Sequence, residues 1–205
     1  MGIDKLLLRR EPPDPYLCQP IRTDRFVLAN CNLRDAIKVT APWRADPEIL
    51  ENLMYGQRSY SAFAWVRSVG RPDGQTRFFH AIMPKEGGGT IGAHRLSINR
   101  SGTVSLAIVI HARSWWGKGV FEEVRRGIMD HFAVSERVTR FEGHVLARNV
   151  SSIYNYQKLG FRLVGYENKS WLSPFSETLL DTVQFEMMAD DWIAQRHIKV
   201  DADDR

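Results

Sequence analysis

Two glycines flanking a lysine form the stretch of this sequence that is best suited to bind an anion. Trp116-Gly117-Lys118-Gly119-Val120 follows an apolar segment and precedes an amphipathic one. Glycines allow a backbone to approach a ligand closely, and the helix that follows presents unpaired N–H groups and the positive end of its dipole. Lys118 adds a mobile positive charge. The pattern predicts an anion site, with an ordinary glycine-containing turn as the alternative for this motif alone.

A second pattern combines Asn149, Tyr156 and Lys158-Leu159-Gly160-Phe161. Seven helical residues make almost two turns, so positions 149 and 156 point nearly the same way. Asn149 is placed to cap the helix, and Gly160 to end it. The alternative is that Tyr154 or Tyr156 only packs and that Asn149 is only a cap.

In this order and spacing, the two patterns resemble the acyl-coenzyme A site of the GNAT acetyltransferase superfamily, in particular its RimJ/RimL-like ribosomal-protein acetyltransferase branch. The resemblance covers roughly residues 20–190, and its specific part lies in 104–165. It implies a single α+β domain over 20–198, with a central mixed, mainly antiparallel twisted sheet flanked by helices. Splayed strands would form the acyl-CoA cleft. Residues 1–19 would be an N-terminal arm, either flexible or docked on the surface, and 199–205 a C-terminal tail.

The resemblance also implies roles for individual residues. The glycine loop would hold the pyrophosphate of acetyl-CoA, and the backbone at Val109 and Ile110 would hold the acetyl carbonyl. Tyr156 would donate a proton to the departing thiolate, with Ser152 as the alternative. The predicted cofactor-binding residues are Val109, Ile110, Trp116, Gly117, Lys118, Gly119, Val120, Asn149 and Ser152, and the predicted catalytic residues are Tyr156 and Ser152.

The chain departs from the superfamily pattern Gln/Arg-x-x-Gly-x-Gly/Ala at two positions. Trp116 stands at the Gln/Arg position, which the RimL-like branch tolerates, and Phe121 stands where a small residue is usual. The Phe121 ring must turn into the core to leave room for the phosphates. Phe121 therefore favours the alternative of an inactive acyl-CoA-binding regulatory or scaffold module, whereas Tyr156 and the glycine pair favour catalysis.

The proposed reaction is direct attack of a primary amine on acetyl-CoA, with a protein N-terminus or a small-molecule amine as acceptor. The candidates for a general base are His94, His111, Glu142 and His144, each of which could also be an ordinary surface or interior residue, with water as the alternative. Acceptor choice is expected to depend on residues 42–60, with Trp43, Tyr55 and Tyr60, and on a loop over 168–177, with Trp171 and Phe175. These aromatic residues could equally be core or dimer contacts.

Composition limits the remaining possibilities. The 205 residues are 43% hydrophobic and 25% charged, which suits one globular domain. The net charge of +4 suits an anionic ligand but is too small to argue for nucleic-acid binding by itself, so nucleic acid is not an expected partner. Among the arginines that could contact nucleic acid, Arg125 and Arg126 are expected on a solvated helix face balanced by Glu122 and Glu123. We expect a cytoplasmic protein without membrane segment or metal site, possibly a homodimer.

Periodicity and turn residues predict the elements that position these patterns. Strands are expected at 21–28, 78–83, 90–98, 104–110, 138–147, 161–166 and 178–188, and helices from 33 to 41, from 46, and at 59–69, 120–133, 151–159 and 189–198. Helix 120–133 carries an apolar stripe of Val120, Val124, Ile128 and Phe132.

Overall fold

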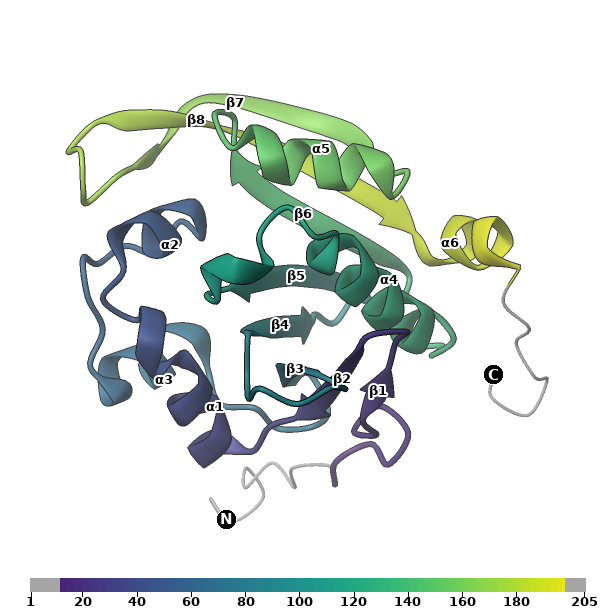
Figure 1. Ribbon diagram of the computed structural model, residues 1–205. Coiled ribbons are helices and arrows are strands. Elements are labelled where there is room, and N and C mark those ends of the chain that lie inside the picture. The colour runs from purple at the N-terminus through teal and green to yellow at the C-terminus, as the bar shows by residue number, and fades with distance from the viewer. Residues whose placement is uncertain (1–11, 198–205) are drawn as a thin grey trace, which may run out of the picture.

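The computed structural model describes residues 12–197, which form an eight-stranded sheet in the order β1-β2-β3-β4-β5-β6-β8-β7 (Figure 1). All neighbouring strands are antiparallel except β5 and β6, which are parallel. The strands are β1 (Ile21–Arg22), β2 (Phe26–Asn30), β3 (Arg77–Pro84), β4 (Gly92–Ile98), β5 (Thr103–Ile110), β6 (Arg140–Leu146), β7 (Arg162–Leu172) and β8 (Leu179–Met188). The predicted mixed, mainly antiparallel α+β fold is confirmed.

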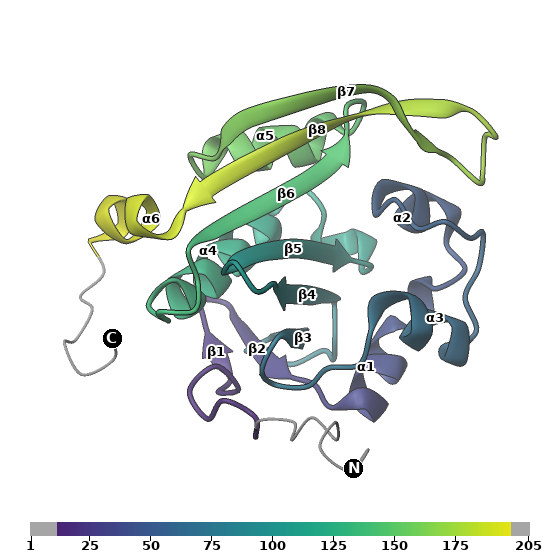
Figure 2. The same cartoon turned by 180° about the vertical axis from the view of Figure 1, so that it is seen from behind.

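Helices cover both faces of this sheet, as the two opposite views show (Figures 1 and 2). One face carries α1 (Leu33–Thr40), α2 (Pro47–Asn52) and α3 (Ala62–Val69). The other face carries α4 (Val120–Ala133) and α5 (Val150–Lys158), and α6 (Ala189–Arg196) packs beside α4. Short 3-10 turns lie at Ala41–Trp43 and Arg113–Trp115.

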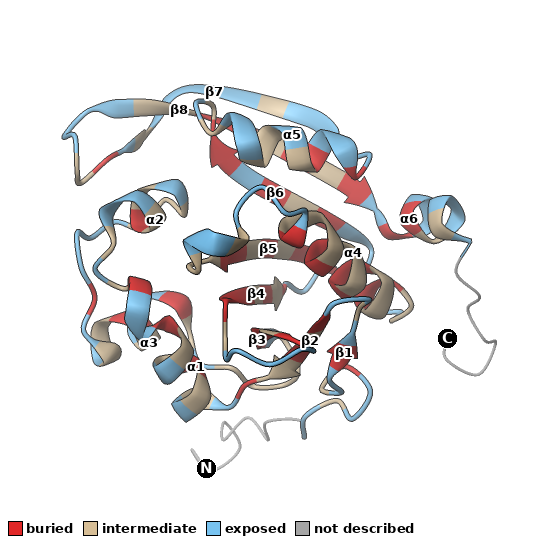
Figure 3. Ribbon diagram, in the orientation of Figure 1, coloured by how far each residue is buried: buried red, intermediate tan, exposed pale blue. Residues whose placement is uncertain are grey.

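Alternating side chains of the strands divide the apolar core into two clusters. On β3, Phe78 and Ile82 face α4 in the larger cluster, whereas Phe79 and Ala81 pack with α1–α3 in the smaller one. The central strands consist mostly of buried and half-buried residues (Figure 3), because one cluster packs on each of their faces. The sheet therefore separates two helical layers, each with its own apolar cluster.

Helix α4 buries its predicted apolar stripe, since Val120, Val124, Ile128 and Phe132 are all buried. The expectation that Arg125 lies on the solvated face is wrong, because only 2% of its surface is exposed. At 100° per residue, position 125 lies only one step around the helix from Val124, so it borders the stripe.

The strand pair β5 and β6 opens a gap in the sheet. They are paired only from Thr103 to Ser105 on β5 and from Arg140 to Glu142 on β6. Beyond Ser105 and Glu142 the two strands separate, while β5 stays paired with β4 and β6 with β8. The sheet thus provides the predicted splayed strands.

Two elements differ from those predicted. The strand expected at 21–28 is a hairpin, because Thr23 turns the chain by hydrogen bonding with Phe26. The loop expected at 168–177 is wrong in its first half, because β7 continues to Leu172 against β8, and only 173–178 connect the two strands. Trp171 therefore belongs to a strand.

The structure describes only part of the predicted N-terminal arm and none of the predicted C-terminal tail. Residues 12–19 dock on the domain, where Leu17 is buried in the larger core cluster and Asp14 N–H donates to Gly74 O. The remainder of the predicted arm, 1–11, and the predicted tail, 199–205, lie outside the described residues. No helix within 12–197 is long and apolar enough to cross a membrane.

Candidate functional site

A cavity of about 740 Å³ follows the gap between β5 and β6 and reaches both faces of the sheet. Its walls are β5, β6, the starts of α4 and α5, and α2. The cavity brings together nine of the predicted residues: Val109, Ile110, Trp116, Gly117, Gly119, Val120, Asn149, Ser152 and Tyr156. Lys118 is not part of its lining.

The glycine loop has the backbone that its sequence predicts. Gly117 and Gly119 have φ angles of 72° and 70°, a conformation that favours glycine, and Gly119 is the N-cap of α4. Within the described chain, no side chain caps this helix, so its first N–H groups face the cavity unpaired. Trp116 fixes the loop to the sheet, because its Nε1 donates to Ile110 O at 2.8 Å. Unpaired N–H groups at the start of a helix are the arrangement that typically binds anions.

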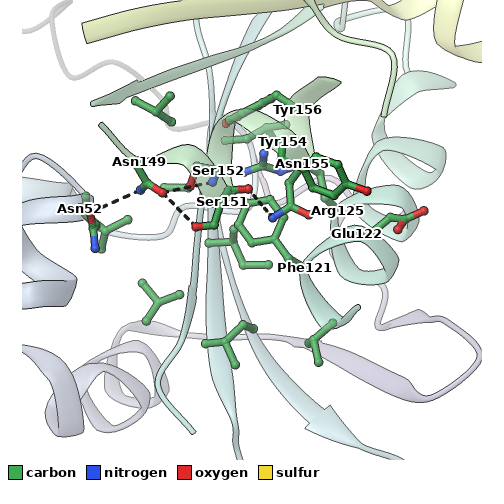
Figure 4. Close-up of a pocket in the computed structure, with 18 of the residues that line it drawn as sticks. Asn52, Phe121, Glu122, Arg125, Asn149, Ser151, Ser152, Tyr154, Asn155 and Tyr156 are labelled. Carbon is green, nitrogen blue, oxygen red and sulfur yellow. Dashed lines mark hydrogen bonds between the residues drawn. The ribbon is translucent and has the colours of Figure 1, made fainter. Parts of the chain in front are cut away.

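Asn149 fixes the start of α5 and links it to α2. Its Oδ1 accepts from Ser152 N at 3.1 Å and from Ser151 Oγ at 3.0 Å, and its Nδ2 donates to Asn52 Oδ1 at 3.4 Å (Figure 4). The predicted cap is therefore present. Ser152, whose backbone N–H this cap holds, lines the cavity.

Tyr156 lies at the closed end of the gap. Its side chain is buried, and its ring stacks on Phe185 with centroids 5.1 Å apart. The phenol lies against Gly143, the first residue of β6 after the part that pairs with β5. A Cβ atom on residue 143 would stand only 2.2 Å from the hydroxyl oxygen of Tyr156. Gly143 therefore makes room for the hydroxyl at the closed end of the cavity.

Gly143→Ala is expected to displace the phenol, because the added methyl cannot coexist with the ring. We expect a loss of about 1–3 kcal/mol in the free energy of unfolding, as for other overpacked sites, together with a lower kcat. Thermal denaturation and steady-state kinetics measure the two effects. Gly165→Ala is the control, because its nearest atom is the Gln184 side-chain oxygen at 3.4 Å. Equal stability and kcat in both variants would contradict this placement.

Phe121 packs toward the core. Its ring contacts the larger core cluster and lies 4.2 Å from the carbon of the Arg125 guanidinium. That guanidinium also lies 4.1 Å from the centre of the Tyr156 ring, so it is held between two aromatic rings (Figure 4). Burial lowers the pKa of Arg125, and the neighbouring Tyr156 phenol partly offsets the effect.

On the opposite face of the sheet, Glu142 and His144 project from β6 into the cavity. Glu142 accepts a hydrogen bond from the Ser105 hydroxyl. His144 Nε2 lies 2.8 Å from Thr182 Oγ1, which donates to Glu167 Oε2 at 3.3 Å. The Thr182 hydroxyl also lies 2.7 Å from Ser170 Oγ. When the single Thr182 proton goes to the Glu167 carboxylate, which can only accept, Ser170 and His144 Nε2 both donate to Thr182, and His144 Nδ1 carries the free lone pair.

The other two candidate bases lie elsewhere. His94 is fully buried between the sheet and α4, where burial, followed by the nearby His80 and two arginines, lowers its pKa well below the usual value. Burial also lowers the pKa of His111. Neither residue lines the cavity. Strand alternation separates His94 from Glu142 and His144, because His94 points to the α4 side.

Comparison with known proteins identifies the family of this chain. A sequence model described as the acetyltransferase (GNAT) domain matches residues 25–162. The chain belongs to the GNAT acetyltransferase family. Membership confirms the predicted acyltransferase class and acetyl-CoA as co-substrate. No curated protein matches this chain by sequence.

Solved GNAT structures share the fold at low sequence identity. Spermidine N-acetyltransferase from Vibrio cholerae, bound to CoA and spermine, has a TM-score of 0.68 and 14% identity, covering 82% of this chain and 98% of that one. RimL, a ribosomal L7/L12 alpha-N-protein acetyltransferase in complex with CoA, has a TM-score of 0.67 and 13% identity, covering 84% and 99%. The ribosomal-protein-S5-alanine acetyltransferase from Vibrio fischeri has a TM-score of 0.68 and 16% identity, covering 85% and 98%.

The sequence did not predict two sets of side chains at this cavity: the residues that hydrogen bond around His144, and Arg125. Thr182 and Glu167, which orient His144, come from β8 and β7, and no local pattern connects them to β6. Arg125 was assigned to the solvent, although its place beside Val124 in the apolar stripe was a usable signal. Among residues 12–197, no group of three His, Cys, Asp or Glu side chains could hold a metal ion.

Proposed function

We propose that this protein transfers an acetyl group from acetyl-CoA to a primary amine by direct attack, without a covalent enzyme intermediate. The observation that carries the proposal is the continuity of the cavity. It joins the uncapped start of α4, through the gap between β5 and β6, to the opposite face that bears Glu142 and His144. A donor and an acceptor can therefore meet from opposite sides of the sheet.

The donor would bind on the α4 side. The unpaired N–H groups at Val120 and the residues after it would hold the pyrophosphate, and the open space at Gly117 leaves room for its close approach. The free edge of β5 offers N–H groups to the acetyl carbonyl. Since N–H groups alternate between the two edges of a strand, only one of Val109 and Ile110 can serve.

The acceptor would bind on the opposite face, where the amine nitrogen attacks the thioester carbon and the C–S bond breaks. His144 Nδ1 would take the proton that the attacking nitrogen releases, with Thr182 and Glu167 holding the ring. Glu142 would attract the ammonium form of the acceptor to this face, and this form would lose one proton to water before the neutral amine attacks. On the donor side, Tyr156 would supply the proton that the leaving sulfur needs, and Ser152 is the alternative donor.

His144→Gln is expected to lower kcat/KM by about 10²–10⁴-fold, the usual contribution of a general base. Glutamine can still bond to Thr182 but has no basic nitrogen. Thr182→Val should give a smaller loss, because it removes only the orientation of the ring. His111→Gln is the control, since His111 does not line the cavity. Full activity in His144→Gln would move the base to Glu142 or to water.

Acceptor choice is proposed to depend on α2, which lines the cavity, and on the tip of the β7–β8 hairpin, which lies beside α2 (Figures 1 and 2). The Ser173 hydroxyl donates to Glu51 of α2, and Arg58, in the loop after α2, binds both Pro174 O and Glu177 of the hairpin tip. Of the predicted aromatic residues, Trp43 and Tyr60 are buried and therefore belong to the core. Structural neighbours that act on spermidine or on ribosomal proteins support polyamines and protein N-termini as first candidates.

A thiol-release assay with acetyl-CoA tests the proposal directly. The panel contains peptides with free N-termini, polyamines and other primary amines, and mass spectrometry identifies the amide product. We expect at least one amine to release CoA well above the hydrolysis rate. CoA binding without acceptor-dependent release would favour the inactive binding module. A homodimer also remains a prediction, which sedimentation of the purified chain would test.

A further inference from the structure

Arg125 is a buried cation without an anion. Its surface is 2% exposed, and no carboxylate among residues 12–197 forms an ion pair with it. Its Nε and Nη1 atoms are buried and have no hydrogen-bond partner in the described chain. A buried guanidinium without its hydrogen bonds costs free energy, so such groups are normally paired. Because Arg125 also lines the cavity, a ligand entering the cavity can supply the missing partner.

The location of Arg125 separates this site from the pyrophosphate site. The guanidinium lies over the ring of Tyr156, whose hydroxyl contacts Gly143 at the closed end of the strand gap. The start of α4 lies at the other, open end, next to the last residue of β5, because Trp116 binds Ile110 O there. A donor whose pyrophosphate occupies the start of α4 would therefore place its acyl end nearest Arg125.

The face on which Arg125 lies also distinguishes donor from acceptor. Arg125 approaches the gap from the α4 and α5 side, whereas Glu142 and His144 approach it from the opposite side. An anionic group on the acceptor would meet Glu142, a carboxylate, before it reached Arg125. The partner of the guanidinium is thus expected on the donor.

We infer that Arg125 recognises a carboxylate at the far end of the acyl group, so that this enzyme takes donors of the dicarboxylic acyl-CoA class in addition to acetyl-CoA. The inference rests on the proposed function. Two aromatic rings, Phe121 and Tyr156, hold the guanidinium, and a carboxylate can bind it through two N–H groups at once, namely Nη2 together with either Nε or Nη1. In the transfer, the amine forms an amide with the acyl carbonyl, and the C–S bond breaks. The thiolate takes a proton, and the distal carboxylate does not react.

Binding measurements without acceptor test the inference. Titration calorimetry compares three pairs of donors matched in chain length: malonyl- with propionyl-CoA, succinyl- with butyryl-CoA, and glutaryl- with pentanoyl-CoA. We expect the wild type to bind the carboxylated member of at least one pair about 10- to 100-fold more tightly, the usual contribution of a charge-assisted hydrogen bond. Arg125→Met, which keeps the volume but not the charge, should abolish the preference and still bind acetyl-CoA.

Arg126→Met is the matched control. Arg126 is the next residue of α4, but it is partly exposed, pairs with Glu122 at 2.7 Å and does not line the cavity. It should keep the full preference. Arg125→Lys, which keeps the charge at shorter reach, should retain part of it. If thermal denaturation shows that neither Arg125 variant folds, the inference is judged from the wild type alone, by whether it binds the carboxylated donor of any pair more tightly than the uncharged one.

Different experimental results would overturn the carboxylate site and the proposed acetyl transfer. Equal binding within all three pairs by the wild type, or a preference that survives in Arg125→Met, would overturn the carboxylate site and leave the acetyltransferase proposal standing. Absence of binding to CoA itself would overturn both. A carboxylate preference in binding, with the amide product carrying the same carboxylate, would establish the donor class.

Discussion

Tyr156→Phe is expected to lower kcat by about 10²–10⁴-fold and to leave the dissociation constant of CoA nearly unchanged. The substitution removes only the hydroxyl at the closed end of the gap. It keeps the ring between Phe185 and the Arg125 guanidinium, so the packing that shapes the cavity survives. The loss would therefore appear in the chemical step, where the departing thiolate needs a proton. Steady-state kinetics and calorimetry with CoA separate the two effects.

Two further variants make this test decisive. Tyr166→Phe also removes one phenol hydroxyl, but that hydroxyl bonds to Asp181 at 2.6 Å, outside the cavity, so turnover should be unchanged. Ser152→Ala tests the competing proton donor. Normal turnover in Tyr156→Phe combined with a large loss in Ser152→Ala would transfer the role to the serine. Normal turnover in both Tyr156→Phe and Ser152→Ala would mean that water supplies the proton to the departing thiolate.

Gly119→Glu is expected to weaken CoA binding by about 100-fold or more. The new carboxylate would stand at the unpaired N–H groups of α4, where it would compete with the pyrophosphate and repel it. The left-handed φ of 70° at this position adds backbone strain for any side chain. Calorimetric titration with CoA gives the change in dissociation constant.

Gly119→Ala distinguishes charge from strain. A Cβ at this position meets only Arg25 Nη2, at 3.8 Å, so alanine brings the same strain without bulk or charge in the site. We expect its affinity to fall much less than that of Gly119→Glu. If Gly119→Glu binds CoA as tightly as the wild type, the phosphate-loop assignment is wrong. If both variants lose affinity equally, the loop conformation and not the anion site controls binding.

The locally encoded parts of the fold and site were predictable. The caps of α1 and α2 are Asn32 and Asp46, and each makes its hydrogen bonds to N–H groups two or three residues away. The glycine loop and the Asn149 cap depend on contacts of the same short range. Sequence spacing reports such contacts directly, because the chain between the partners is too short to permit many alternatives.

Sequence alone determined the glycine bend, the apolar stripe of α4 and the spacing that places Asn149 and Tyr156 on one helix. Only the tertiary structure decided that Arg125 lies between Phe121 and Tyr156, that Gly143 makes room for the phenol, and that Thr182 and Glu167 orient His144. Periodicity predicts the face of a helix or strand on which a side chain lies, but it does not predict which residues pack against that face. Apart from Phe121, which lies one helical turn before Arg125 on α4, those partners come from segments 13 to 38 residues apart, brought together by strand pairing and helix packing.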